Sequence, residues 1–425
     1  MTITIHRGIN QIGGCITEIA SASGTKILID LGHNLPEGDE PSDDIYDNSV
    51  NLAALLDGVE AVFYTHPHGD HIGFETEVAK RGIKQYIGFL SKELMILLKG
   101  HLAYNGNPKF QAELDAFKSF STYKEKDEIS FNDITITPYF VSHSAPDSYM
   151  FLIECDGKKV LHTGDFREHG YRGKGLSSTI RSYIAHRKID ILITEGTMLS
   201  RDDSRLMTEN ELKHKAIDIF QKHRNFFVMC SSMDADRLAS FYQAAKAVGK
   251  MFVVDGFQWK VLETIGNTLG TKSDLYRFPR RRYYENHMDA IRNASNANGF
   301  VMIVRNNRHC RKFIETIFPT LDPKETCFLY SQYLGYILST HSAFQQRTYD
   351  FVHSHEWHID YLHTSGHASR EALAKVCTKL NPRLAIIPIH RDANSDFRTL
   401  DMSQDLKDKV LTESRTIEDV EINIK

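Results

Sequence analysis

Short apolar runs separated by glycine-rich turns dominate the beginning of the chain. They occupy residues 3–12, 15–20 and 26–32, and bounding turn residues make this the pattern of β-strands. Apolar positions three and four residues apart in 75–80 and 91–98 predict helices. Further strand patterns lie at 134–141, 149–154, 159–162 and 189–194. This half of the chain therefore predicts sheets that are flanked by helices.

Helix and strand patterns alternate from about residue 200 onward. Strands are predicted at 226–230, 251–255, 299–305 and 327–331, with helices such as 209–222 and 236–247 between them. This alternation predicts an α/β unit with a parallel sheet. The pattern changes again after about residue 345, with strands at 357–364 and 384–390, a helix at 370–380, an amphipathic segment at 406–411 and a strand-like end at 420–424.

The chain has 425 residues, which is too long for one ordinary core, so we expect two domains or one domain with a large insertion. Hydrophobic residues make up 41% and charged residues 25%, as in soluble globular proteins. No apolar run approaches the roughly 20 residues of a membrane span. Residues 1–7 lack the pattern of a signal peptide and are typical of a strand. We therefore expect no membrane partner.

Six cysteines are scattered through the chain without a C-x-x-C pair. This distribution indicates reduced thiols in a cytoplasm, and argues against a disulfide framework or a cysteine-ligated zinc site. The net charge of −4 excludes a polycation, so affinity for nucleic acid would have to come from a local basic patch. The cysteines are Cys15, Cys155, Cys230, Cys310, Cys327 and Cys377.

Three histidines and an aspartate are packed into Thr65-His66-Pro67-His68-Gly69-Asp70-His71, directly after the apolar run 59–64. At the end of a buried strand each of these polar side chains needs its own partner. Two divalent cations would satisfy all four groups at once. Imidazole and carboxylate ligands without a nearby thiolate favour zinc, with manganese or iron as alternatives. The segment therefore predicts a metal site.

Four further polar residues stand at the ends of predicted strands: His143, Asp165, Glu195 and His390. Strand ends from distant parts of a sequence converge on one face, which makes these side chains candidate ligands. A single Asp or His in such a place more often caps a turn. Their joint recurrence after the histidine cluster favours one shared site.

The order of these residues resembles the metallo-β-lactamase superfamily, in which a His-x-His-x-Asp-His motif is followed by a His, an Asp and a final His. Glu195-Gly196-Thr197, 363–369 and 388–390 resemble the three signatures of the β-CASP nucleases of that superfamily. Segments 230–237 and 330–336 are similar to those of bacterial members near ribonuclease J.

The resemblance implies an α/β fold, an αββα metallo-β-lactamase sandwich with an inserted α/β β-CASP domain. Residues 1–200 would form the first part of the metallo-β-lactamase domain, and 346–425 its second part. Residues 201–345 would form the β-CASP insertion, in agreement with the changes of pattern near 200 and 345.

The resemblance also implies two Zn²⁺ ions per chain, with Mn²⁺ as an alternative. Three histidines, His66, His68 and His143, would hold the first ion. Asp70, His71 and His390 would hold the second, and Asp165 would bridge both. Glu195 would accept a hydrogen bond from the remaining ring nitrogen of His390 and so fix its tautomer.

Carried over to this chain, the family's activity is hydrolysis of RNA phosphodiester bonds by a metal-bridging hydroxide, in RNA processing or decay. Asp70, Glu195 and His367 would be catalytic, with His367 stabilising charge or protonating the leaving oxygen. The expected partner is single-stranded RNA, and a homodimer is one expected assembly. Substrate-binding positions implied by the motifs are Ser231, Ser232, Arg237, Ser331, Ser365 and His367.

Three other functions stay open. A DNA nuclease is one, because the sequence contains no recognisable reader of the RNA 2′-hydroxyl. A small-substrate hydrolase of the same fold is the second. Members of that kind, however, have no counterpart of Glu195, of His367 or of the inserted domain. The third is an inactive RNA-binding scaffold, against which the complete set of seven ligands argues.

Residues 276–284, Tyr-Arg-Phe-Pro-Arg-Arg-Arg-Tyr-Tyr, place four arginines among four aromatic residues in the expected insertion. Arginine–phosphate contacts with base stacking would suit a single strand. A solvated basic loop anchored by its rings is the alternative. Arg237 is the stronger phosphate candidate because of its motif, and it would also have to neutralise the nearby Asp234.

Overall fold

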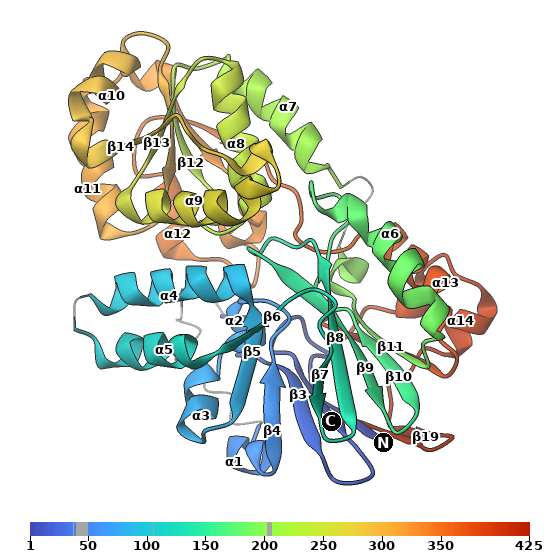
Figure 1. Ribbon diagram of the computed structural model, residues 1–425. Helices are drawn as coiled ribbons and strands as arrows, with labels where there is room; N and C mark the ends of the chain where they lie inside the picture. Colours follow the sequence, from blue (N-terminus) through green and yellow to red (C-terminus); the bar gives the residue numbers. More distant parts are fainter. Residues whose placement is uncertain (37, 40–49, 105, 202–205) are drawn as a thin grey trace. The chain divides into compact units, whose positions relative to one another are not determined.

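The computed structural model describes residues 1–36, 38–39, 50–104, 106–201 and 206–425 (Figure 1). The chain forms two compact units. Unit 1 contains Met1–Leu35, Pro41–Leu206 and Gly366–Lys425, and unit 2 contains Pro36–Glu40 and Met207–Ser365. Most of unit 2 is therefore one long insertion into the sequence of unit 1.

The first sheet of unit 1 has eight strands in the order β19-β20-β1-β2-β3-β4-β5-β6. Its middle is antiparallel where β1, β2 and β3 meet, whereas β3 to β6 run parallel to one another. The bounds are β1 Thr2–Arg7, β2 Ile16–Ala20, β3 Lys26–Leu31, β4 Val59–Phe63, β5 Lys84–Gly88, β6 Ser121–Tyr123, β19 Arg415–Ile417 and β20 Val420–Ile424.

The second sheet of unit 1 has six strands in the order β18-β11-β10-β9-β8-β7. Strands β10, β11 and β18 are parallel neighbours, and β7, β8, β9 and β10 form an antiparallel meander. The bounds are β7 Ile129–Phe131, β8 Ile134–Val141, β9 Ser148–Cys155, β10 Lys158–His162, β11 Ile191–Glu195 and β18 Ala385–Ile389.

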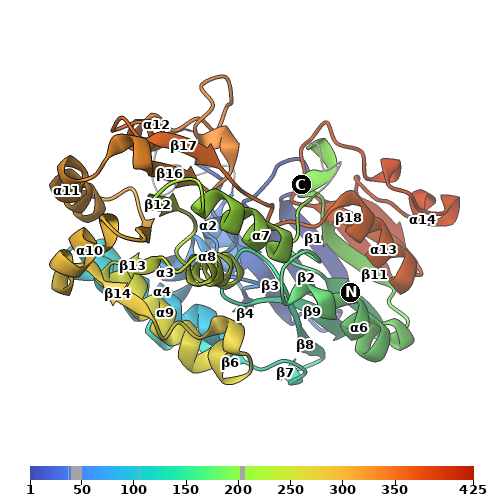
Figure 2. The same cartoon turned by 90° about the horizontal axis from the view of Figure 1, so that it is seen from above.

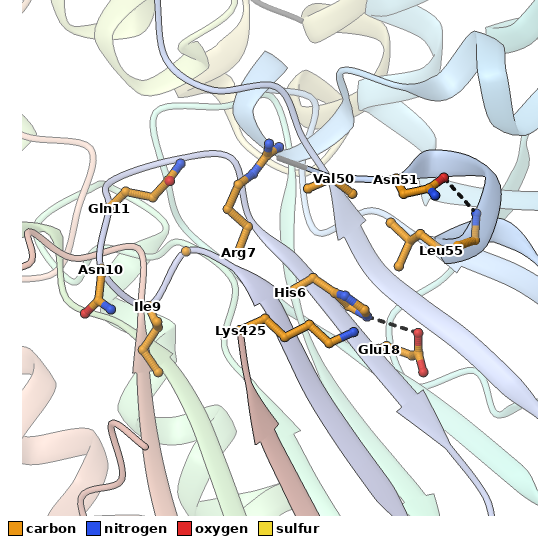
Figure 3. A pocket seen from close by; sticks show the side chains of 12 residues that line it. His6, Arg7, Ile9, Asn10, Gln11, Glu18, Val50, Asn51, Leu55 and Lys425 are labelled. Carbon is orange, nitrogen blue, oxygen red and sulfur yellow. Dashed lines mark hydrogen bonds and ion pairs between the residues drawn. The ribbon is translucent and has the colours of Figure 1, made fainter. Parts of the chain in front are cut away.

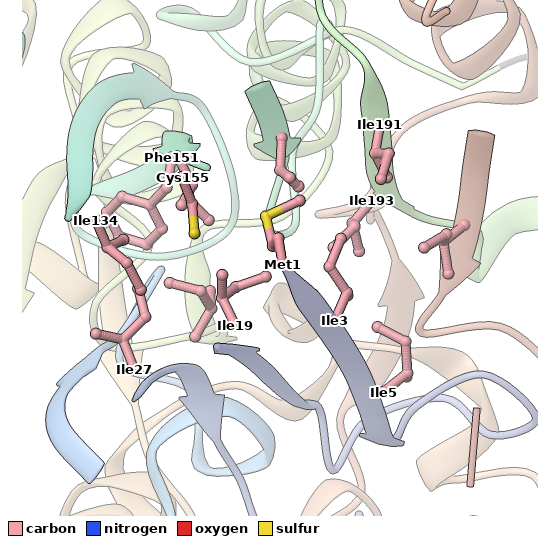
Figure 4. Close-up of a cluster of buried hydrophobic side chains, with 14 of the residues drawn as sticks. Met1, Ile3, Ile5, Ile19, Ile27, Ile134, Phe151, Cys155, Ile191 and Ile193 are labelled. Carbon is pink, nitrogen blue, oxygen red and sulfur yellow. The ribbon is translucent and has the colours of Figure 1, made fainter. Parts of the chain in front are cut away.

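The two sheets enclose one apolar core (Figure 4). Ile3, Ile19 and Ile27 from the first sheet are buried with Ile134 and Ile193 from the second. Alternate positions along each strand point to the same face, so isoleucines two residues apart fill the space between the sheets. Burial of this set on both inner faces makes the sandwich the stable core of unit 1.

Helices cover the outer faces of the sandwich (Figures 1 and 2). One group lies beside β4, β5 and β6, and α6 and α13 pack on the outer face of the second sheet. Asp147 accepts hydrogen bonds from the amides of Leu90 and Ser91 and so caps the start of α4. The bounds are α1 Leu52–Leu56, α2 Gly69–Ile72, α3 Glu75–Lys80, α4 Phe89–Ala103, α5 Pro108–Ser119, α6 Leu176–Thr179, α13 Arg370–Leu380 and α14 Gln404–Asp408.

Unit 2 is built on a six-stranded sheet in the order β14-β13-β15-β12-β16-β17. Every pair in it is parallel, as the alternation of helices and strands predicts. The bounds are β12 Asn225–Met229, β13 Met251–Val254, β14 Arg281–Tyr283, β15 Phe300–Val304, β16 Thr326–Tyr330 and β17 His358–Tyr361.

Helices cover both faces of the unit 2 sheet (Figure 2). Apolar residues of α10, α11 and α12 pack against one face, whereas α8 and α9 follow strands on the other. A capping box between Thr208 and Glu211 fixes the start of α7. The bounds are α7 Glu209–Phe220, α8 Ala235–Ala247, α9 Gly256–Thr268, α10 Met288–Ser295, α11 Arg308–Ile317 and α12 Gln346–Val352. In the described part of the chain, no helix is long and apolar enough to cross a membrane.

The predicted α/β fold class is confirmed, and several elements begin and end at the predicted residues, among them β8, α3 and α13. The second boundary differs from the expected residue 345, because unit 2 extends to Ser365. The reason is β17, whose residues from His358 to Tyr361 pair with β16 and complete the parallel sheet of unit 2.

Candidate metal centre

The strand directions bring the predicted ligands to one edge of unit 1. His66 follows β4, and Asp165 and His390 follow the parallel strands β10 and β18. β8 runs in the same direction as β10, so His143 follows it at the same edge. The carboxyl ends of strands that run in one direction meet at one edge, which explains how residues so distant in sequence converge.

The first predicted ligand group is a set of three imidazoles. Nδ1 of His68 lies 3.0 Å from Nε2 of His66 and 3.1 Å from Nε2 of His143. All three nitrogens lie close enough together to hold one ion. Burial lowers the pKa of His66 and that of His143 well below the usual value, so both rings are neutral and offer lone pairs.

The second predicted group surrounds Asp70. Its Oδ2 lies 3.1 Å from Nε2 of His390 and 3.9 Å from Nε2 of His71. Oδ2 of Asp165 lies between the two groups, 3.3 Å from Nε2 of His71 and 3.5 Å from Nε2 of His390. The same oxygen is 3.9 Å from Nε2 of His66 and 3.8 Å from Nε2 of His143. Asp165 therefore lies between the two predicted ligand groups.

These donors fit divalent cations. Nε2 of His71 is buried and has no hydrogen-bond partner among the described residues. Burial lowers the pKa of His71, but the carboxylates of Asp165, Asp30 and Asp70 overcome this effect and raise it well above the usual value. A bound cation would supply the positive charge that these carboxylates favour. Neutral imidazoles and carboxylates are ligands that zinc and manganese both accept.

Asp30, the penultimate residue of β3, contacts a candidate ligand and was not singled out in the sequence analysis. Its carboxylate is fully buried and accepts hydrogen bonds from Nδ1 of His71 at 2.7 Å and from the amide and hydroxyl of Thr65 at 2.7 and 2.9 Å. Asp30 has a positive φ of 59°, a strained conformation that these bonds maintain. The only sequence signal was an aspartate near the end of an apolar strand.

Glu195 does not contact His390 as expected, so this prediction was wrong. Thr197 is the residue whose Oγ1 lies 2.7 Å from Nδ1 of His390. Glu195 instead accepts hydrogen bonds from the amides of Phe166 at 2.9 Å and Ala368 at 3.2 Å. Its Oε2 lies 3.0 Å from Nδ1 of His367. Glu195 is thus the carboxylate that orients His367.

His367 lies against both ligand groups. Its ring centroid is 5.0 Å from that of His143 and 5.2 Å from that of His390. Nδ1 of His367 is 3.6 Å from Oδ2 of Asp165. With 19% of its side chain exposed, His367 is more accessible than the three ligand side chains named here. This combination suits a residue that meets a substrate rather than a further ligand.

Thr197→Val is expected to weaken metal binding about 10- to 100-fold, the usual effect of losing a partner that orients a ligating histidine. The substitution removes the hydroxyl that holds Nδ1 of His390. Competition between the protein and a chromophoric zinc chelator measures the change. Thr194→Val is the matched control, because Thr194 is equally buried and its hydroxyl lies 3.2 Å from that of Thr163. Equal zinc affinities in the two variants would contradict this assignment.

The other predicted substrate-binding residues, Ser231, Ser232, Arg237, Ser331 and Ser365, lie in unit 2. Arg237 is buried, and its guanidinium forms an ion pair with Glu209 at 3.1 Å. It also donates to Oγ of Ser331 at 2.8 Å and to the carbonyl of Thr364 at 3.0 Å. These contacts favour a positioning role for Arg237 over a direct phosphate contact.

Asp234 caps a helix of unit 2. Its side chain is buried and accepts a hydrogen bond from the backbone amide of Arg237 at 3.2 Å, which caps the start of α8. A carboxylate at this position is favoured by the unpaired amides of the first helical turn. Asp234 is therefore explained by the local fold of unit 2.

The aromatic and cationic side chains of the arginine-rich stretch 276–284 differ in their exposure. Tyr276, Phe278 and Tyr284 are buried, so these three rings anchor the segment rather than stack on bases. Arg281 is half-buried with its guanidinium 4.0 Å from the ring of Trp259. The side chains of Arg277, Arg280 and Arg282 are exposed. They are the part of the stretch that can meet phosphates.

Residues 17–197 match the model of the metallo-beta-lactamase superfamily. This part of the chain is therefore similar to that superfamily. Its match ends at Thr197 and therefore includes the histidine cluster, His143, Asp165 and Glu195.

Several curated relatives of the chain carry the name ribonuclease J. The protein from Mycobacterium tuberculosis is 24% identical over 256 residues, which cover 59% of this chain and 43% of the relative. The one from Helicobacter pylori is 29% identical over 170 residues, 39% of this chain and 23% of the relative. An RNase J-like protein from Methanocaldococcus jannaschii is 28% identical over 201 residues, 46% of this chain and 42% of the relative. The matched region spans less than half of each relative.

A crystal structure of a protein of unknown function from Enterococcus faecalis has a similar fold. The TM-score is 0.67, with coverage of 94% of this chain and 96% of that chain. Sequence identity is 17%, so this likeness concerns the fold alone. It covers both the metallo-beta-lactamase part and the inserted unit.

Proposed function

We propose that this chain is a two-metal-dependent nuclease that hydrolyses phosphodiester bonds of single-stranded RNA. One observation carries the proposal: Oδ2 of Asp165 lies 3.3 to 3.9 Å from Nε2 of His71, His390, His143 and His66. A carboxylate oxygen shared by four imidazoles suits two neighbouring cations. The names of the curated relatives support RNA as the substrate. Unit 2 would correspond to the β-CASP domain.

Bound at these ligands, two divalent cations would polarise a phosphoryl oxygen and lower the pKa of a water molecule. The chain's own residues supply the orientation. Asp30 fixes the ring of His71, and Thr197 fixes that of His390. Glu195 holds Nδ1 of His367, which orients the ring so that it can exchange a proton with the leaving oxygen. Zinc is the favoured ion because of the number of imidazole ligands.

His367→Ala is expected to retain both metal ions and to slow RNA cleavage about 10²- to 10⁴-fold, the usual contribution of a positioned general acid. Metal content by mass spectrometry and single-turnover cleavage test the two parts. His186→Ala is the control, because His186 is exposed on unit 1 and outside the centre. Full activity in His367→Ala would overturn the proposed role of His367.

Replacing Arg277, Arg280 and Arg282 by Ala together is expected to weaken RNA binding most at low salt. Each lost phosphate contact reduces the slope of log affinity against log salt by about 0.7 for a single strand. Fluorescence anisotropy at several salt concentrations measures the slope. The control replaces Lys215, Lys312 and Lys324, three exposed cations of the same unit. An equal slope of log affinity against log salt in both triple variants would show that the stretch is a solvated loop without phosphate contacts.

The direct test compares matched 5′-monophosphorylated single-stranded RNA and DNA, with the metal-quantified protein and with His68→Ala. Metal-dependent cleavage of RNA that is absent in the variant supports the proposal, and the product ladder distinguishes internal from terminal cuts. Cleavage of DNA alone would replace it by a DNA nuclease. RNA binding without cleavage of either polymer, with both metals bound, would favour a binding scaffold. Light scattering of the same sample tests the proposed homodimer.

A further inference from the structure

Cys15 lies beside two candidate ligands of the metal centre. Its Sγ, a ring nitrogen of His71 and a ring nitrogen of His390 all lie within 4.8 Å of one another. The side chains of Cys15 and of both histidines are buried. Sulfur and imidazole nitrogen are both ligands that zinc accepts, so these three donors could share one cation.

The two histidines each have one ring nitrogen left for a cation. Nδ1 of His71 lies 2.7 Å from Oδ2 of Asp30, and Nδ1 of His390 lies 2.7 Å from Oγ1 of Thr197. Nε2 of His71 is buried and has no hydrogen-bond partner among the described residues. A buried polar atom without a partner is costly, which points to a ligand at this place rather than to apolar packing alone.

The backbone of Cys15 is tied to the segment that carries the ligands. Its amide donates to the carbonyl of Asp70 at 3.0 Å, and its carbonyl accepts from the amide of Gly32 at 3.2 Å. A Cβ at Gly8 would lie 3.1 Å from Sγ of Cys15 and 3.7 Å from the amide nitrogen of His390. The glycine at residue 8, with φ of +108°, therefore leaves room for the sulfur next to His390.

The loop that precedes Cys15 borders a cavity of about 490 Å³ (Figure 3). Residues 8–11 of the loop line this cavity, but Cys15 does not. Arg7, at the end of β1, donates to the carbonyl of Gly14 at 2.7 Å and so holds the residue before Cys15. The sulfur is thus enclosed within unit 1 and is not open to this cavity.

Cys15 differs from the other cysteines in its surroundings. All six cysteines are buried and free. In the part of the chain that the structure describes, Cys15 is the one cysteine that belongs to a group of candidate metal ligands. The absence of a C-x-x-C pair argued against a cysteine ligand, because that argument considers local spacing only. Cys15 reaches the histidines through the fold.

We propose that Sγ of Cys15 is a further ligand of the second ion, beside His71 and His390, and makes this position selective for zinc over manganese. The inference rests on the metal centre of the proposed function. On binding, the thiol releases its proton to solvent and the sulfur donates an electron pair to the cation. A soft thiolate favours zinc, whereas manganese prefers oxygen ligands.

Cadmium tests the sulfur directly. A cadmium–thiolate bond has an ultraviolet charge-transfer band that cadmium bound to imidazoles and carboxylates lacks. Cadmium is exchanged for the resident ions of the purified protein by dialysis, and absorbance and bound cadmium are measured together. Cys15→Ala removes the proposed ligand. Cys155→Ala is the matched control, because Cys155 is buried in the same apolar core of unit 1.

The wild type and Cys155→Ala are expected to show the thiolate band, and Cys15→Ala is expected to lose it. Zinc affinity is expected to fall about tenfold or more in Cys15→Ala, since the loss of a residue that merely orients a ligating histidine already has an effect of this size. Manganese affinity is expected to change less. Cys15→Ser repeats the comparison if Cys15→Ala has a lowered thermal midpoint.

Absence of the band in the wild type overturns the inference and depends on no variant. Persistence of the band in Cys15→Ala also overturns it. Equal losses of zinc and manganese affinity in Cys15→Ala would contradict the proposed selectivity.

RNA cleavage by the zinc-loaded wild type separates this inference from the function on which it rests. A thiolate band that depends on Cys15, without cleavage of RNA, would overturn the nuclease and support the ligand. Cleavage of RNA by a protein that shows no thiolate band would support the nuclease and overturn the role of Cys15.

Discussion

Asp165→Asn is expected to abolish RNA hydrolysis and to leave the protein with fewer than two bound metal ions. The side chain lies between both ligand groups, with Oδ2 3.3 Å from Nε2 of His71 and 3.8 Å from Nε2 of His143. An amide offers a neutral oxygen in place of a charged one, which weakens coordination of divalent cations. Mass spectrometry for metal content and cleavage of labelled RNA measure the two losses together.

Asp133→Asn is the control for this experiment. Asp133 is an exposed carboxylate at the turn between β7 and β8, where it accepts a hydrogen bond from the hydroxyl of Ser23. Two ions and full activity are expected to remain in this variant. Retention of both ions and of activity in Asp165→Asn would instead exclude the bridging role, and with it the arrangement proposed for the centre.

Arg237→Met is expected to lower the free energy of unfolding by about 3–5 kcal/mol, because it leaves a buried carboxylate without its partner. Glu209 is fully buried and receives the guanidinium of Arg237 at 3.1 Å. Arg237 also donates to Ser331, which lies at the end of β16. Denaturant unfolding monitored by circular dichroism measures the loss.

Two further variants make the interpretation specific. Arg237→Met combined with Glu209→Gln is expected to recover part of the stability, since the unpaired charge is removed as well. Arg292→Met is expected to change stability by less than about 1 kcal/mol, because its pair with Asp289 lies on the surface. Equal effects of Arg237→Met and Arg292→Met would show that the buried pair contributes no more than a surface pair.

The cluster of candidate ligands could be selected from the sequence because its signal is local. His66, His68, Asp70 and His71 lie within six consecutive positions, and a buried strand precedes them. The later members could be selected because each follows a recognisable apolar strand. Directions and lengths of strands are well encoded by apolar patterns, so the edge at which these residues meet could be anticipated.

The partners of the candidate ligands could not be predicted in the same way. Glu195 and Thr197 are two residues apart, and which of them reaches His390 depends on the turn at Gly196, where φ is −144°. Asp30 required a positive φ that no pattern of apolar residues indicates. Such contacts depend on side-chain positions across several strands rather than on local sequence.

The role of Arg237 shows a related limit. Its motif favoured a phosphate contact, whereas the structure surrounds its guanidinium with Glu209, Ser331 and Thr364. A sequence reveals that an arginine begins a helix but does not reveal a buried carboxylate from another helix. The extent of unit 2 beyond residue 345 had the same cause, because the pairing of β17 with β16 is a long-range contact.

The pairing of β11 with β18 has a consequence for the order in which the protein matures. Ile191 is in register with Ala385, although almost the whole of unit 2 lies between them in sequence. Closing so long a loop delays folding, since distant strands must find each other after the intervening segment is made. A chain still being synthesised lacks His390 and therefore one of the three ligands predicted for the second ion. An incomplete chain would therefore be inactive until its synthesis has passed His390.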